Sequence, residues 1–199
     1  MKRLSLLFLY ILIVSCAGTH ETHFYTLNIP EIGPSLQTAK FPFTVGVDRI
    51  YTEDPYSDDR LIYRDSLFEV KFYHYHRWVA SPSKMVTEMV LAQLKSSGFF
   101  QAVQQLPVGE LTDYTLSGRI KTFEEWDEGN LWFGKVRIEF RVQKNETGEI
   151  VLQKEFTSKI NVESREPVAV VQALSLGVEK CTEQMLQELD ALFPKNLTR

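Results

Sequence analysis

Cys16 is the residue whose type and surroundings carry the clearest chemistry in this sequence. It closes the segment Ile13-Val14-Ser15-Cys16, in which an aliphatic residue and two small or modest ones precede a cysteine, as in the bacterial lipobox. Lys2 and Arg3 give the chain a positive start, and residues 4–14 form an apolar run of the length typical of a signal-peptide core. This run is too short to span a bilayer, which takes about 20 apolar residues.

The motif predicts how the chain is processed. We expect residues 1–15 to be removed as a lipoprotein signal peptide, and Cys16 to carry a diacylglycerol thioether and an acyl group on its new amino terminus. An ordinary signal peptide with a chance cysteine is the alternative. Residues 16–23 are small and polar, which favours a flexible tether. Several acyl chains give stable anchoring, because each buried methylene contributes about 0.8 kcal/mol.

Ala17 and the overall charge bear on location and partners. An Asp after the lipidated cysteine would favour retention in the inner membrane, so Ala17 indicates a periplasm-facing protein on the outer membrane rather than the inner. Without its first 15 residues the chain is still long enough for one domain with a substantial core. Its net charge changes from −4 to −6 at pH 7 because two basic residues are lost. A nucleic-acid partner would need a basic face, so none is expected.

The remaining candidates for chemistry are weaker. His74 and His76 are spaced to share one face of a strand, but no third ligand lies near them, so no metal site is predicted. The acidic residues Glu124, Glu125, Asp127 and Glu128 are expected in a solvated hairpin tip, and a cation site or a carboxylate pair is the alternative. The sequence has no glycine-rich phosphate loop, nucleophile elbow or paired-cysteine site. We therefore predict no enzyme activity and no cofactor beyond the lipid on Cys16.

Hydrophobic periodicity predicts the fold. Strands are expected over residues 24–27, 43–51, 60–64, 68–75, 99–106, 113–123, 135–143 and 149–162, and helices over 83–96 and after Pro167. This order, without steady alternation of strand and helix, indicates an α+β fold with a mainly antiparallel sheet and two helices on one face. A single domain is expected over residues 24–195. Cys181 lies in the apolar stripe of the last helix, which favours a buried core thiol.

Aromatic residues are dense in two hairpin-like regions. They are Phe72, Tyr73, Tyr75, Trp78, Trp126, Trp132 and Phe133. Two interpretations are about equally supported by this pattern. These side chains either form an apolar patch for a partner protein or lipid, or they belong to the core with ordinary surface exposure.

Several segments together resemble a known family. They are the lipobox, Phe24-Tyr25-Thr26-Leu27, Val45-Gly46-Val47, Asp59-Arg60-Leu61-Ile62-Tyr63-Arg64, and Tyr75-His76-Arg77-Trp78 leading through Ser81-Pro82 into a helix. In order and spacing they resemble the ABC-type transport auxiliary lipoproteins, whose best-known branch is the paraquat-inducible protein C type. The run from Tyr56 to Arg60 and the run from Trp78 to Pro82 depart from the family pattern, which leaves open which transport system is served.

The resemblance implies a fold, a role and partners. It implies a fold similar to the amino-terminal domain of TolB, and a non-catalytic accessory that works beside a mammalian-cell-entry (MCE) domain protein, an ABC permease and its ATPase in moving hydrophobic molecules across the envelope. The residues that either organise the fold or present a docking face are Arg60, Tyr63, Arg64, Arg77, Trp78 and Trp132. For Arg64 and Arg77, burial against a carboxylate such as Asp59 or Glu88 would favour the structural role. A homo-oligomer and a monomer both fit the composition.

Two other functions stay open from the sequence. A direct lipid carrier, or a lipoprotein of lipopolysaccharide or outer-membrane assembly, would have a cavity lined by Met85, Met89, Phe140 or Phe156. An envelope hydrolase would have convergent polar groups in a pocket, but the sequence offers no candidate nucleophile.

Overall fold

The computed structural model describes residues 20–29, 39–107 and 111–196. Cys16, the predicted signal peptide and the first half of the predicted tether therefore lie outside the described residues. The strands are β1 (His23–Tyr25), β2 (Phe41–Thr52), β3 (Arg60–Arg64), β4 (Lys71–Trp78), β5 (Phe100–Gln105), β6 (Tyr114–Glu128), β7 (Leu131–Lys144) and β8 (Ile150–Asn161). The helices are α2 (Pro82–Ser96) and α3 (Pro167–Asn196).

The strands form one mixed sheet. The longest ladders are antiparallel and join β6 to β7 and β7 to β8, as the short connections between these strands require. Strand β2 instead runs parallel to both β5 and β6, and β3 meets the far end of β6 in parallel. The α+β class is confirmed, and the sheet is antiparallel in its long meander but mixed as a whole. Parallel pairing arises because β2 returns to β5 only after passing through α2.

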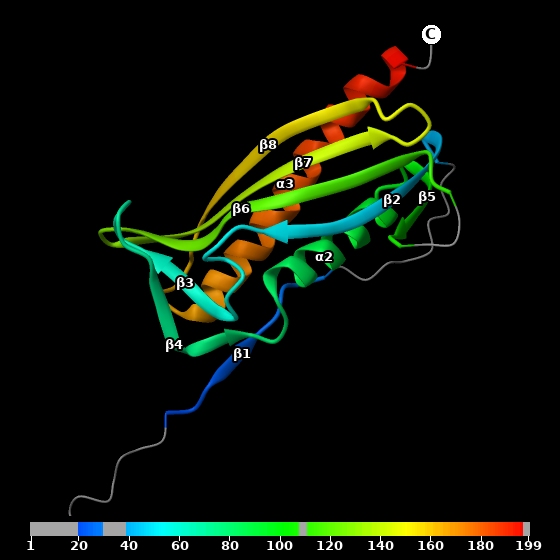
Figure 1. The fold of residues 1–199 in the computed structure, drawn as a ribbon. Coiled ribbons are helices and arrows are strands. Elements are labelled where there is room, and N and C mark those ends of the chain that lie inside the picture. Colours follow the sequence, from blue (N-terminus) through cyan, green and yellow to red (C-terminus); the bar gives the residue numbers. More distant parts are fainter. Residues whose placement is uncertain (1–19, 30–38, 108–110, 197–199) are drawn as a thin grey trace, which may run out of the picture.

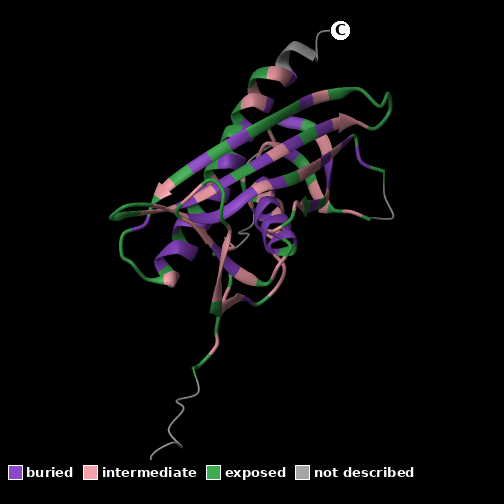
Figure 2. Cartoon of the chain, turned by 60° about the vertical axis from the view of Figure 1, so that its left-hand side comes forward, coloured by how far each residue is buried: buried purple, intermediate pink, exposed green. Residues whose placement is uncertain are grey.

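Both helices cover the same face of the sheet, as predicted (Figure 1). Helix α3 packs on β7 and β8, and α2 packs on β2 and β5 and also touches α3. Ser81 caps α2 by accepting a hydrogen bond from the backbone N–H of Lys84, and Pro82 follows at a position where it loses no helical bond. Buried residues alternate with exposed ones along the long strands (Figure 2). The inward residues of β7, Val136, Ile138, Phe140 and Val142, are at most 2% exposed.

Two glycines let α3 approach the sheet closely. A Cβ on Gly177 of α3 would lie 2.6 Å from Cγ2 of Val136, and a Cβ on Gly134 of β7 would lie 2.8 Å from the backbone carbon of Ala173. Cys181, one turn beyond Gly177, is fully buried with its Sγ 3.6 Å from the carbonyl oxygen of Phe156. Burial raises the pKa of this thiol to about 12. The prediction of a core thiol is confirmed.

The predicted strand boundaries hold to within five residues, and two of the differences are informative. Strand β4 begins at Lys71 instead of residue 68, and Phe68 is 98% exposed in the preceding turn. Strand β6 continues to Glu128 instead of ending near residue 123. Among the described residues, no helix is both long and apolar enough to cross a membrane.

Candidate functional site

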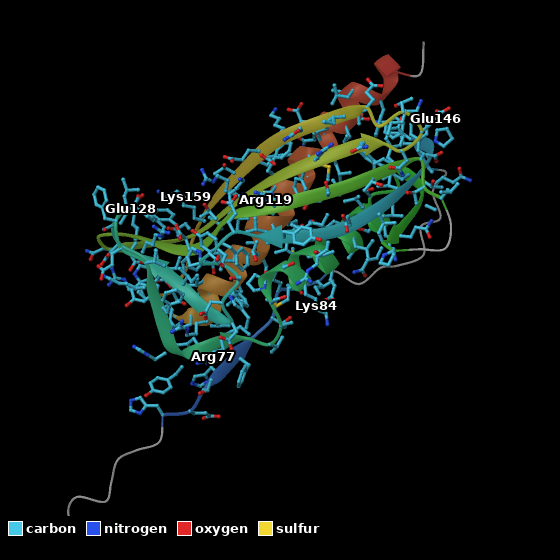
Figure 3. All side chains as sticks on the ribbon, viewed as in Figure 1. Arg77, Lys84, Arg119, Glu128, Glu146 and Lys159 are labelled. Atoms are coloured by element: carbon cyan, nitrogen blue, oxygen red, sulfur yellow. The ribbon has the colours of Figure 1, made fainter. Side chains whose placement is uncertain are left out.

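The residues predicted for docking gather around one end of the sheet. Strands β3 and β4 form an antiparallel hairpin there, and β3 pairs with the last residues of β6. In Figure 3, Arg77 of β4 and Glu128 of β6 mark this end, while Glu146 marks the opposite one. Because the hairpin and the end of β6 carry many charged and aromatic side chains, this end is the candidate site.

Arg64 is held inside a buried polar network. Its Nε donates to Oε2 of Glu124 over 2.8 Å, and the hydroxyl of Tyr56 donates to the same oxygen over 2.6 Å. Glu124 is 3% and Tyr56 is 5% exposed. Burial, followed by the nearby carboxylate, raises the pKa of Tyr56, so this phenol stays protonated. This burial against a carboxylate favours the structural role for Arg64, and its partner is Glu124 in place of Asp59 or Glu88.

A second network lies on the other face of β6. Glu125 is fully buried, and the hydroxyl of Tyr73 donates to its Oε2 over 2.9 Å. Its Oε1 has no hydrogen-bond partner among the described side chains, and neither has Oδ1 of Asp127. Burial is the main cause that raises the pKa of Glu125 to about 8, and Asp127 beside it adds to this effect. Burial raises the pKa of Asp127 as well. The two carboxyl groups are therefore placed to share a proton.

The predicted solvated loop at the acidic cluster is wrong for Glu124 and Glu125. Strand β6 continues through both residues, and its hairpin turns only at Gly129, whose φ is +62°. The alternation of a strand then puts the two carboxylates on opposite faces. The signal that could have revealed this was Trp126 directly after the two charges, because aromatic residues are enriched in strands.

Arg60 and Arg77 lie at the surface of the hairpin. Arg60 donates to both carboxylate oxygens of Asp58 at 2.8 and 2.7 Å, and its guanidinium lies 4.3 Å from the ring centre of Phe72. Arg77 donates from Nη1 to both oxygens of Asp59, at 2.7 and 2.8 Å, and its side chain is 35% exposed. The side chains of Arg60 and Arg77 are more exposed than that of Arg64, so a partner protein can contact them.

The remaining predicted docking residues separate into core and surface. Trp78 is 5% exposed and packs 5.4 Å from the ring of Phe123, so its side chain belongs to the core. Tyr63 is half-buried, with its ring 4.9 Å from that of Tyr73. Trp132 is also half-buried but lies on the β6–β7 hairpin, beneath the guanidinium of Arg165 at 5.7 Å. Core packing thus accounts for part of the aromatic density noted in the sequence.

His76 is engaged with its neighbours on β1. Its Nδ1 is 2.8 Å from the hydroxyl of Tyr25, and its ring is stacked 5.3 Å from that of His23. Burial, and then the charge of His23, lower the pKa of His76. Within the described part of the chain, no three His, Cys, Asp or Glu side chains are grouped so that they could hold a metal ion.

Comparison with known proteins identifies the family. Residues 25–186 match the family described as the ABC-type transport auxiliary lipoprotein component. The chain belongs to this family. The matched region runs from β1 into α3 and includes every element of the candidate site.

Solved structures show the same fold as this auxiliary lipoprotein. XCC0632 from Xanthomonas campestris is 17% identical, with a TM-score of 0.75 over 89% of this chain and 100% of that one. A second solved structure, of an uncharacterized protein, is 13% identical, with a TM-score of 0.69 over 85% of this chain and 99% of that one. The hypothetical protein CT253 from Chlamydia trachomatis is 7% identical, with a TM-score of 0.52 over 76% of this chain and 98% of that one. No curated protein sequence matches the chain.

The residues named for a carrier cavity do not line a common one in this auxiliary lipoprotein. Met85, Phe140 and Phe156 are at most 5% exposed and belong to the packed core. Met89, which is 2% exposed, also forms part of the floor of a groove beside β1 and α3.

Proposed function

We propose that this protein is a non-catalytic, lipid-anchored accessory of an ABC transporter that works with an MCE-domain protein to move lipids or other hydrophobic molecules across the cell envelope. The family match over residues 25–186 is the observation that carries the proposal. The sequence has no nucleotide-binding motif, so the ATPase is a separate subunit. We further propose that Cys16 carries the lipid and that the anchored protein faces the periplasm from the outer membrane.

The proposed docking face consists of Arg60, Tyr63, Arg77 and Trp132. Arginine and aromatic side chains are enriched in the centres of protein interfaces. Tyrosine and tryptophan offer a large contact area with only two side-chain torsions to order, and the planar guanidinium of arginine presents several hydrogen-bond donors. Asp58 and Asp59 already hold the two guanidinium groups in place, which lowers the entropy lost when a partner binds. The buried networks of Glu124 and Glu125 fix the strands beneath them.

The pairing of β1 with β4 supports a link between anchor and docking face. The register places Phe24 opposite Arg77, and Tyr25 opposite Trp78. Phe24 is eight residues after Cys16 and belongs to the first strand after the predicted tether. A partner bound at Arg77 would therefore be held near the surface of the anchoring membrane.

The test is an affinity purification of the intact lipidated protein from a mild-detergent membrane extract, with mass spectrometry of both proteins and lipids. We expect an MCE-domain protein and the ABC subunits to co-purify with the wild type. The double variant Arg60→Ala/Arg77→Ala should lose most of them while keeping its circular-dichroism spectrum. The matched control Arg141→Ala/Lys144→Ala removes two basic side chains at the opposite end of the sheet and should retain them.

Two results would count against this proposal. Retention of all transporter subunits by the Arg60→Ala/Arg77→Ala variant would show that these arginines are not part of a docking face. Recovery of stoichiometric lipid with no transporter subunit from the wild type would favour the alternative function of a direct lipid carrier or an assembly factor for lipopolysaccharide or the outer membrane.

A further inference from the structure

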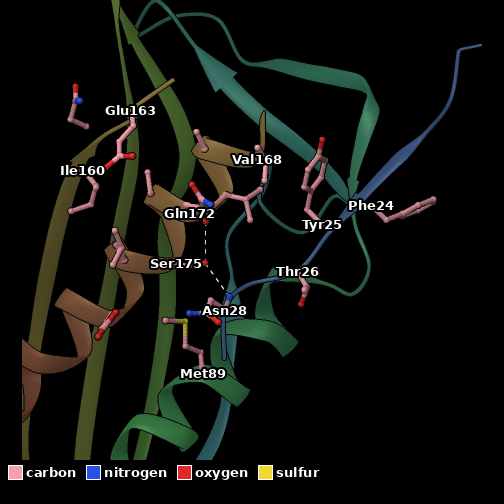
Figure 4. Close-up of a pocket in the computed structure, with 16 residues that line it drawn as sticks. Phe24, Tyr25, Thr26, Asn28, Met89, Ile160, Glu163, Val168, Gln172 and Ser175 are labelled. Carbon is pink, nitrogen blue, oxygen red and sulfur yellow. Dashed lines mark hydrogen bonds between the residues drawn. The ribbon is translucent and has the colours of Figure 1, made fainter. Parts of the chain in front are cut away.

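A groove of about 580 Å³ lies over the first turns of α3, between the segment that contains β1 and the end of β8 (Figure 4). One wall is formed by Phe24, Tyr25 and Thr26, and the other by α3. At its inner end, the backbone N–H of Asn28 donates to Oγ of Ser175 over 3.2 Å, which joins the two walls. The volume is in the range of sites that bury a small ligand, roughly 300–1,000 Å³.

The helix side of the groove is apolar where a surface helix is normally polar. Val168 is 52% and Leu176 is 48% exposed, and both lie on the outer face of α3 with Gln172 between them. Further along the same face, the exposed residues are Lys180, Glu183, Gln184 and Gln187. The apolar surface is therefore restricted to the part of α3 that faces the groove, where Phe24, itself 61% exposed, adds to it. Such a local patch is characteristic of a binding site.

The position of the groove relative to the anchor indicates the kind of ligand. Phe24 is eight positions after Cys16, and an extended chain spans at most about 3.6 Å per residue. The mouth of the groove therefore lies within roughly 29 Å of the lipidated residue. A hydrophobic site held this close to a bilayer meets acyl chains at high local concentration.

The charges around the groove narrow the choice of headgroup. Glu163 and Glu179 belong to its lining, which contains no lysine or arginine. In the described part of the chain, neither carboxylate has a hydrogen bond or an ion pair. Two unpaired carboxylates attract an ammonium group and repel a ligand with net negative charge, such as a fatty acid or an anionic phospholipid.

From these observations, we propose that the groove binds one acyl chain of a membrane lipid whose zwitterionic headgroup places its ammonium beside Glu163 or Glu179, as phosphatidylethanolamine would. The buried carbons of the chain contact Met89 and the apolar face of α3. The side-chain amide of Gln172, at the mouth, is placed to donate to an ester carbonyl. This inference depends on the lipid anchor of the proposed function but not on the transporter.

The test uses the full-length lipidated protein in detergent and native mass spectrometry with added phosphatidylethanolamine or phosphatidylglycerol. We expect one bound phosphatidylethanolamine per chain in addition to the covalent anchor. The preference over phosphatidylglycerol should be on the order of fivefold or more, which corresponds to the attraction of two unit charges about 4 Å apart in water. The change Leu176→Glu should reduce the bound fraction at least about tenfold, since it places a charge in the acyl site.

Matched variants separate a specific loss from a general one. Leu131→Glu changes an exposed apolar residue of the β6–β7 hairpin and should bind lipid as the wild type does. Val168→Glu repeats the test at the other end of the groove if Leu176→Glu folds poorly. The double change Glu163→Gln/Glu179→Gln should keep the lipid but bring the two headgroups to equal affinity.

Three results would overturn the inference. They are the absence of any lipid adduct on the wild type, an adduct that Leu176→Glu and Val168→Glu both leave unchanged, and equal binding of the two lipids by the wild type. If the groove variants instead lose transporter subunits in the affinity purification while binding lipid normally, the groove is a protein-docking site. Loss of transporter contact in the Arg60→Ala/Arg77→Ala variant with normal lipid binding would leave both proposals standing.

Discussion

Replacing the buried Glu125 by Gln should change how stability depends on pH. An ordinary glutamic acid has a pKa of 4.5, whereas burial and Asp127 raise that of Glu125 to about 8. Between these two values the unfolded chain has lost this proton and the folded chain keeps it. The folded state therefore binds more protons, and its free energy of unfolding decreases as pH rises, by about 1.4 kcal/mol per pH unit at most.

The magnitude follows from this slope. From pH 5.5 to pH 8, the wild type should lose about 2–3 kcal/mol of unfolding free energy through this group, because Asp127 shares the proton and the slope flattens near pH 8. Gln is uncharged at every pH, keeps an oxygen for the hydroxyl of Tyr73 and can donate to Asp127. Glu125→Gln should thus be close to the wild type at pH 5.5 and about 2–3 kcal/mol more stable at pH 8.

Urea denaturation followed by circular dichroism at several pH values between 5 and 8 measures this difference. The titration of His76 occurs in both proteins and cancels in the comparison. Glu183→Gln, a change of an exposed residue on α3, is the matched control. Its free energy of unfolding should depend on pH as that of the wild type does. If the free energy of unfolding of Glu125→Gln depends on pH as that of the wild type does, then Glu125 is ionised in the folded protein and the reasoning is refuted.

Further predictions test other parts of the structure. Gly177→Ala should cost about 1–3 kcal/mol in urea denaturation, because its Cβ would lie 2.6 Å from Cγ2 of Val136; wild-type stability would show that α3 can move away at no cost. Cys181 should resist thiol reagents in native buffer and react fully in denaturant, since it is buried and its pKa is raised to about 12; fast native labelling would contradict its burial. Arg64→Ala should destabilise the protein by about 2–4 kcal/mol, because it leaves a buried carboxylate without its cation. Arg77→Ala, which breaks a more exposed pair, should cost less than about 1 kcal/mol, and equal losses would show that burial does not distinguish the two arginines.

Local sequence patterns predicted most of the elements and the antiparallel meander, but not the parallel pairing of the other strands. The alternation in β7 and the cap at Ser81 are properties of neighbouring residues, so the strand and the helix could be recognised directly. The parallel pairing of β2 with β5 joins segments separated by a hairpin and a helix. Such a register depends on how the whole chain packs, which one sequence does not encode locally.

The candidate site could be predicted only in part. A carboxylate beside Arg64 was one of the two roles considered for it, but its partner Glu124 lies 60 residues away. The sequence places Glu124 in a loop because the neighbouring Gly129 and Asn130 are typical of a hairpin tip. The ion pair of Arg64 and Glu124 forms because the pairing of β3 with β6 buries both side chains together, and this pairing joins distant parts of the sequence. The groove was not predicted at all, because β1, α2, β8 and α3 each contribute a few ordinary residues to it.

The way β1 joins the sheet determines how the domain bears mechanical load. Three residues of β1 pair with β4, a further backbone bond runs from the N–H of Val79 to the carbonyl of Tyr25, and Leu27 is buried just beyond. A pull on the amino-terminal tether acts first on these few contacts. The long ladders from β6 to β8 lie outside this path of force. With the proposed lipid anchor at Cys16 and the domain held by a partner, tension in this segment would therefore separate β1 from β4 before it reached the ladders from β6 to β8.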